Sequence, residues 1–156
     1  MNLELIVQDR YQPSTIDETT WVNWFQAWLQ TPGLDLPPAQ TYELSLRLTT
    51  DAEIQALNAQ FRNKNQPTDV LSFAAMEVDF PQIDDDAAAD LYLGDIIISV
   101  DTAVRQAPEH GYTLRKELAW LASHGLLHLL GWDHPDEPSL LIMLQQQENF
   151  LTRSGL

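Results

Sequence analysis

The sequence contains no cysteine, which excludes disulfide bonds and thiolate metal ligands, so any metal site must use His, Asp or Glu. Basic residues are scarce: eight Lys and Arg stand against 23 Asp and Glu, a formal net charge of −15. A field of that sign repels polyanions at long range and by itself argues against nucleic acid. No apolar run approaches the roughly 18 residues of a membrane span. The N-terminus lacks the basic start and apolar core of a signal peptide, so we expect a cytoplasmic protein without a membrane partner.

The length and the distribution of charge set further limits. A chain of 156 residues that is 44% hydrophobic is expected to form a single domain over residues 1–156. The stretch Glu77–Asp90 holds six acids and no base, and it is interpreted as an exposed loop. In contrast, no acid lies between Glu53 and Asp69, where Arg62 and Lys64 are found. That local basic region can bind phosphate even within an acidic protein.

Hydrophobic periodicity predicts alternating strands and helices. Strands are expected over residues 3–7, 41–49, 70–75 and 92–100. Five helices are expected, over residues 17–30, about 50–63, 101–110, about 113–130 and 137–151. This order predicts an α+β fold in which a small mixed sheet of four strands is covered by about five helices.

Several of these helices have a predicted core face or cap. The first carries an apolar stripe at i, i+3, i+4, i+7 and i+8, formed by Trp21, Trp24, Phe25, Trp28 and Leu29. Thr50 is expected to form a capping box with Glu53. The inner face of that helix is then expected to hold Ile54, Leu57 and Phe61, and that of the last helix Leu141, Leu144 and Met143.

The stretch Ser123–Pro135 contains three of the four histidines. His124 and His128 are four residues apart, so on a helix they lie one turn from each other on the same face. Gly131 then occupies a typical helix-ending position, and His134 returns from outside the helix. The three imidazoles are therefore predicted to converge on one point at the end of a helix.

Three neutral imidazoles suit one zinc ion per chain, with a fourth coordination position left for water. That open position distinguishes a catalytic site from a closed structural one, and zinc would lower the pKa of the bound water to about 7. The remaining histidine, His110, precedes Gly111 at the predicted end of a helix, where a cation interacts favourably with the helix dipole. We interpret it as a surface capping residue and not as a ligand.

Two other readings of the histidines stay open. The same H-x3-H-x5-H spacing occurs in a class of zinc proteases, which carry a Glu general base directly after the first His. Here that position is Gly125, which disfavours a peptidase without excluding another zinc-dependent hydrolase. A non-catalytic protein with a structural zinc would need a fourth protein ligand from Asp or Glu, since there is no Cys.

Three segments together carry a family resemblance: LNAQFRNKNQPTDVLSF at residues 57–73, LGDIIIS at 93–99 and HGLLHLLGWDH at 124–134. In this order and with these gaps they resemble the YbeY family, bacterial single-strand-specific metallo-endoribonucleases of rRNA maturation. The resemblance covers roughly residues 42–154. The chain departs from the family at Trp132, where Tyr is frequent, and in an acidic insert near Asp84.

The resemblance implies a function and a set of roles. His124, His128 and His134 would bind zinc, and Arg62 would stabilise charge on phosphate through a two-point contact. The substrate would be single-stranded rRNA, in 3′-end maturation of 16S rRNA and ribosome quality control, with the ribosome or small-subunit proteins as partners and no DNA. A ribosome-associated zinc protein without catalytic activity is the corresponding alternative.

Other residues have two interpretations each. Lys64 either contacts phosphate or is a solvated lysine, and Asp133 either orients a zinc-bound histidine or is a turn residue. Thr68, Asp69 and Ser72 are expected to be turn and strand supports near the pocket. Three aromatic residues are either stacking surfaces for bases or core residues: Phe73, Tyr92 and Trp132. No residue is identified as the general base.

Overall fold

The computed structural model describes residues 2–11, 16–75 and 90–156. The acidic stretch that was expected to be an exposed loop lies outside these ranges except for Asp90, the first residue of a strand. The described residues form one four-stranded sheet whose strands are β1 (Asn2–Asp9), β2 (Thr41–Thr49), β3 (Val70–Ala74) and β4 (Asp90–Ser99). The strand order is β1-β2-β4-β3, in which β3 alone runs antiparallel to its neighbour. The predicted small mixed sheet is therefore confirmed.

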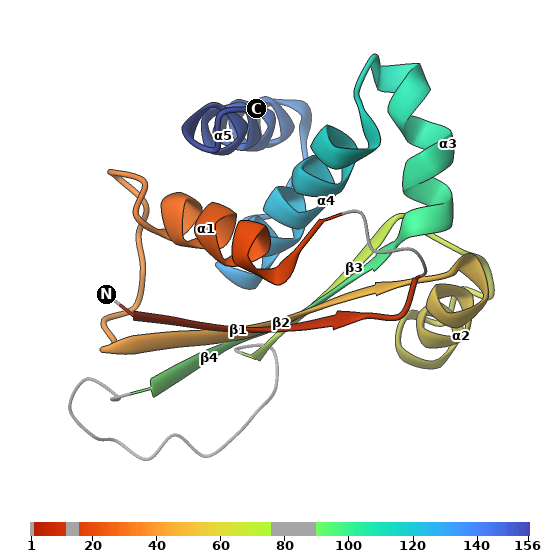
Figure 1. Cartoon of the computed structure of the whole chain (residues 1–156), viewed down its shortest axis with the longest axis horizontal. Coiled ribbons are helices and arrows are strands. Elements are labelled where there is room, and N and C mark those ends of the chain that lie inside the picture. Colours follow the sequence, from red (N-terminus) through yellow and green to blue (C-terminus); the bar gives the residue numbers. More distant parts are fainter. Residues whose placement is uncertain (1, 12–15, 76–89) are drawn as a thin grey trace.

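Five helices of the described residues cover this sheet: α1 (Glu18–Leu29), α2 (Asp51–Arg62), α3 (Val100–His110), α4 (Leu114–Leu129) and α5 (Glu137–Arg153). Figure 1 shows α1 and α4 over one face of the sheet, α5 beyond them and α2 on the opposite face. Among the residues described, no helix combines the length and apolar character that crossing a bilayer requires. The arrangement is the predicted α+β fold.

The core lies on both faces of the sheet. The apolar stripe of α1 is buried as predicted and packs with Leu44, Leu46 and the inner residues of α4. On the α2 side, Ile54 forms a smaller cluster with Leu71 and Ile97. Because Ile96 and Ile98 face the main core and Ile97 faces the small one, β4 is buried on both sides, as a central strand should be.

Three local predictions were wrong. Phe61 is 56% exposed, because it contacts the Phe73 ring at the margin of the small cluster around Ile54 and is not enclosed by that cluster. Leu141 is 60% exposed, since the inner face of α5 consists of Met143, Gln147, Phe150 and Leu151. Thr50 caps α2 as expected, but the Glu53 carboxylate accepts hydrogen bonds from Arg47 and Thr49 and does not complete a capping box.

The close packing of α4 on the sheet depends on Gly125. A Cβ atom added there would lie 2.8 Å from Cγ2 of Ile96 and 3.1 Å from Oγ of Ser72. Ile96 is fully buried on the central strand and is stiff at χ1, so it has little freedom to move away. Position 125 therefore faces β4, and its glycine allows the helix to approach the strand.

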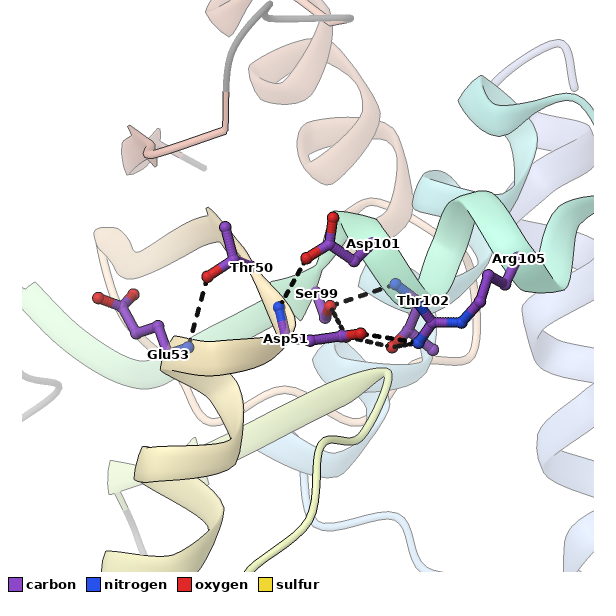
Figure 2. A network of polar contacts seen from close by, with 7 residues as sticks. All are labelled: Thr50, Asp51, Glu53, Ser99, Asp101, Thr102 and Arg105. Carbon is purple, nitrogen blue, oxygen red and sulfur yellow. Dashed lines mark hydrogen bonds and ion pairs between the residues drawn. The ribbon is translucent and has the colours of Figure 1, made fainter.

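A polar network joins the first turns of α2 and α3 (Figure 2). Thr49 and Ser99 are register partners at the ends of two parallel strands, so the helices that follow them begin side by side. The Asp51 carboxylate accepts hydrogen bonds from Ser99 (2.6 Å), Thr102 (2.6 Å) and Arg105 (2.8 Å). In return, Asp101 accepts one from the backbone N–H of Asp51 at 2.9 Å. Each helix start thus supplies a carboxylate to the other.

We predict that Asp51→Ala lowers the free energy of unfolding by about 1–3 kcal/mol, because several hydrogen-bond donors lose their acceptor. Burial alone would raise the pKa of Asp51, but the hydrogen bonds from Ser99, Thr102 and Arg105 outweigh it and hold the pKa below 3.8. The difference from wild type should thus be complete above pH 3.8 and should shrink as the pH falls through the lowered pKa.

Denaturant unfolding at several pH values measures this difference. Glu109→Ala, an exposed acid on α3, is the control and should stay within about 0.5 kcal/mol of wild type. An Asp51→Ala variant as stable as that control at neutral pH would contradict the role of the network.

We also predict that Gly125→Ala destabilises the protein. Crowding against Ile96 should cost about 1–3 kcal/mol, which exceeds the roughly 1 kcal/mol that Ala contributes to helix propensity. Thermal unfolding in an Ile96→Ala background tests the cause, because removing the crowded methyl should relieve part of the effect. An equal loss in both backgrounds would assign the destabilisation to something other than this contact.

Candidate metal centre

The helix α4 holds two of the three candidate ligands and is anchored at both ends. Thr113 caps its start by accepting a hydrogen bond from the backbone N–H of Lys116. At its end, the N–H of Trp132 donates to the carbonyl of Leu127 at 2.9 Å, and that of Gly131 donates to His128 at 3.0 Å. This pair of bonds is a Schellman motif, and Gly131 has the positive φ of 92° that it requires. The chain therefore reverses direction just before His134.

The three histidines converge as the sequence predicted. Nε2 of His124 and Nε2 of His128 lie 3.0 Å apart, and the three residues offer ligand atoms within 4.8 Å of one another. Nitrogens bound to one tetrahedral zinc at 2.0–2.1 Å lie roughly 3.3 Å apart, so the helical pair already has a suitable spacing. His124 and His128 are partly buried, whereas His134 is exposed on its loop. The residues present therefore fit a divalent metal ion.

The electrostatic surroundings keep the two helical imidazoles neutral. Burial lowers the pKa of His124 below its ordinary value of 6.5, with a further contribution from His134. Burial likewise lowers the pKa of His128, and both neighbouring histidines add to the effect. A neutral imidazole keeps a lone pair for a metal ion, so both rings are in the ligand form at neutral pH.

A residue that the sequence analysis missed contacts this site from α5. The Gln147 side chain is fully buried, and its Oε1 lies 3.2 Å from Nδ1 of His124. Its Nε2 donates to the backbone carbonyl of Trp120 at 3.3 Å. The available signal was a polar residue in the apolar stripe Met143–Gln147–Phe150–Leu151, but without the packing of α5 on α4 the pattern does not say what Gln147 contacts.

His124 and His128 line a cleft of about 660 Å³ at the β3 edge of the sheet. Its lining comes from the end of α2, the loop that follows, β3, α4 and the loop after α4: Asn58, Arg62, Lys64, Gln66, Thr68, Asp69, Val70, Leu71, Ser72, His124, His128, Gly131, Trp132 and Asp133. Elements from opposite faces of the sheet thus meet in one cleft, because β3 is the edge strand between them.

Arg62 and Lys64 line the same cleft as His124 and His128. The Arg62 guanidinium donates to the Ser72 carbonyl at 2.7 Å and lies over the Phe73 ring, 5.1 Å from its centroid. These two contacts hold the guanidinium at the outer edge of β3. The sequence placed Arg62 and Lys64 at a helix end, and the structure brings them to the histidines.

The remaining candidates have more local contacts. Asp133 accepts from the backbone N–H of His134 at 2.8 Å, which is a turn contact, so its role toward a bound histidine stays a prediction. His110 ends α3 as expected, but its Nδ1 lies 2.7 Å from the buried Glu117 carboxylate. Thr68 and Asp69 line the cleft, as supports of the pocket would.

The three aromatic residues considered as stacking surfaces lie in different places. Trp132 is partly buried and lines the cleft, and Phe73 lies beneath the Arg62 guanidinium. Tyr92 on β4 donates its hydroxyl to Asp95. An exposed aromatic residue that was not among the candidates, Phe61, contacts the edge of Phe73 with 5.4 Å between the ring centroids.

Comparison with known proteins gives a consistent assignment. The family described as endoribonuclease YbeY matches residues 6–155. A Nostoc protein named Endoribonuclease YbeY is 57% identical over 146 residues, covering 94% of this chain and 79% of the relative. A Cyanothece protein of the same name is 52% identical over 160 residues, covering 100% of this chain and 95% of the relative.

A solved structure extends the comparison to the fold. The solution structure of a Thermotoga maritima protein superposes with a TM-score of 0.61 at 25% identity, covering 97% of this chain and 89% of that one. Together with the three converging histidines and the arginine in their cleft, the matches over nearly the whole sequence place this chain in the endoribonuclease YbeY family.

Proposed function

We propose that this protein is a zinc-dependent endoribonuclease that cuts single-stranded RNA and acts in 3′-end maturation of 16S rRNA and in ribosome quality control. The observation that carries the proposal is the convergence of His124, His128 and His134, the first two of which line one cleft with Arg62. The relatives' name, Endoribonuclease YbeY, supplies the reaction class.

One zinc ion per chain would be held by the three imidazoles. The metal would supply Lewis-acid activation of a water molecule and charge neutralisation at the phosphodiester. Among the described residues, the cluster that could hold an ion consists of these histidines without a carboxylate. Three protein ligands leave a coordination position for water or substrate, which supports a catalytic site over a structural one.

Arg62 would bind the phosphodiester. Its planar guanidinium can present two parallel N–H donors to phosphate oxygens, a contact that strengthens as negative charge develops in the transition state. The bond to the Ser72 carbonyl and the Phe73 ring below it restrict the orientation of the group. Lys64, which lines the same cleft, would add a second positive charge.

The shape of the site favours single-stranded substrates. The cleft is concave, lies at a sheet edge and is bounded by two helices on opposite faces. A flexible strand can bend to bring one phosphate into such a hollow, whereas a duplex holds both backbones on a wide, stiff surface. Trp132 in the cleft wall offers an aromatic surface for a base.

The packing of Gly125 weighs against a zinc peptidase. The Glu general base of that class would follow His124 directly, and position 125 is turned toward β4 with no space for a side chain. A structural zinc in a non-catalytic ribosome-associated protein would need a fourth protein ligand, and it would not require an arginine in the same cleft. Both alternatives are therefore disfavoured by the same site geometry.

The proposal extends to organisation and cellular context. We expect residues 1–156 to belong to a single domain; in support, the main core of the described residues draws on β1, α1, α4 and α5. We expect the protein to act on rRNA in the cytoplasm, with the ribosome or small-subunit proteins as partners and without DNA as a substrate.

We predict that His128→Ala loses both zinc and cleavage of labelled single-stranded RNA, because two histidines cannot hold a catalytic zinc. Zinc content and RNA cleavage are measured on wild type and variant, with and without chelator. Casein serves as the substrate control and should stay intact throughout. Chelator-sensitive loss of casein would instead favour the peptidase, and zinc-free wild-type protein that still cuts RNA would contradict the metal mechanism.

We predict that Arg62→Glu lowers RNA cleavage by at least about 100-fold while zinc stays bound, because a donor to the transition-state charge is replaced by a repelling group. The cleavage rate of Arg62→Lys should lie between those of wild type and Arg62→Glu, since lysine keeps the positive charge but cannot donate two parallel hydrogen bonds. Lys116→Glu, which makes the same charge change at the start of α4, should cleave normally. Undiminished cutting by Arg62→Glu would refute the role.

A further inference from the structure

We infer that Gln147 is a positioning residue that fixes the tautomer and the ring orientation of His124, so that Nε2 carries the metal-binding lone pair. This inference rests on the proposed metal site and assigns a role within it to a residue on another helix. It starts from a buried polar side chain on a helix face that is otherwise apolar.

The two hydrogen bonds of Gln147 determine which way its amide points. A backbone carbonyl can only accept, so the group that faces the Trp120 oxygen at 3.3 Å must be the amide nitrogen. The Ser123 hydroxyl donates to the same carbonyl at 2.8 Å. The amide oxygen of Gln147 therefore faces His124.

The tautomer of His124 follows from that orientation. An amide oxygen accepts only, so Nδ1 of His124, at 3.2 Å, must carry the proton. In a neutral ring the other nitrogen then holds the lone pair. That nitrogen, Nε2, lies 3.0 Å from Nε2 of His128, where the ligand atoms converge. A chain of donors and acceptors thus runs from the backbone of α4 through α5 to the metal-binding atom.

The burial of Gln147 makes this arrangement stiff. The side chain is fully buried between α4 and α5 and lies on the helix face that also holds Met143 and Phe150. Water cannot replace the amide there, so losing it would leave His124 without an acceptor for Nδ1–H. Metal-binding histidines generally donate their second N–H to such an acceptor, and removing the acceptor typically lowers metal affinity 10–100-fold.

The first test is spectroscopic and uses the wild-type protein without metal. At about pH 8 the His124 imidazole is neutral, because burial lowers its pKa below 6.5. Its ¹⁵N chemical shifts then distinguish a protonated from an unprotonated nitrogen. We expect a protonated Nδ1 and an unprotonated Nε2. A protonated Nε2, or an equal mixture of tautomers, would overturn the inference whatever the variants do.

The second test compares zinc affinity by competition with a chromophoric chelator. Gln147→Met has a similar length but no acceptor, and it should bind zinc about 10–100-fold more weakly with a mixed His124 tautomer. Gln147→Glu keeps an acceptor oxygen and should bind within about tenfold of wild type, with Nδ1 protonated. The same change at an exposed neighbour, Gln145→Met, should alter neither quantity.

The outcomes separate this role from others. A Gln147→Met protein that binds zinc as wild type does would overturn the inference. A loss of zinc affinity in Gln147→Met without a change in the His124 tautomer would also overturn the inference, since that result indicates a packing defect alone. Wild-type protein that shows the expected tautomer but binds no zinc would refute the proposed metal site and leave the assignment of Gln147 to His124 standing.

Discussion

The close contact between α4 and the central strand determines where the candidate metal ligands lie. Gly125 faces Ile96 with no room for a Cβ atom, which fixes the rotation of the helix about its axis. Successive residues in a helix are about 100° apart, so the residue before Gly125 and the one three positions after it point to the same flank. These residues are His124 and His128, and both line the same cleft as Ser72 of β3, so that flank is the β3 side. The third ligand depends on the same helix, because the turn at Gly131 brings His134 back.

The location at a sheet edge explains how residues from opposite faces act on one site. α2 and α4 lie on different faces of the sheet, and a central strand would have kept their side chains apart. Because β3 is the edge strand, Arg62 can reach around β3 and donate a hydrogen bond to the Ser72 carbonyl. That hydrogen bond also satisfies a backbone carbonyl of the edge strand, which could otherwise pair with a strand of another chain. The arginine therefore protects the edge and lines the cleft at once.

Local signals in the sequence were enough to predict the helices, the strands and the convergence of the three candidate ligands. They failed where the outcome depends on contacts with another element. The caps at Thr50 and Thr113, the stripe of α1 and the spacing of His124 and His128 are all properties of one segment. The misplacement of Phe61 and Leu141 has a different origin, because each lies on a plausible apolar stripe and only the partner surface decides the face. Gln147 was missed for the same reason: its significance comes from the Trp120 carbonyl and His124, 27 and 23 residues away.

The net charge of −15 is compatible with an RNA substrate, because most of the acidic residues lie outside the cleft and their repulsion falls off with distance from it. Within the cleft, Arg62 and Lys64 are matched by Asp69 and Asp133, so the charged lining is balanced before any ion binds. Neutral imidazoles add no charge, and a divalent ion held by them leaves a local excess of about two positive charges. At physiological ionic strength the Debye length is about 8 Å, which screens exposed carboxylates beyond that distance from a phosphate in the cleft. The acidic surface should therefore slow the approach of RNA far more than it weakens the contacts made once a phosphate lies beside Arg62.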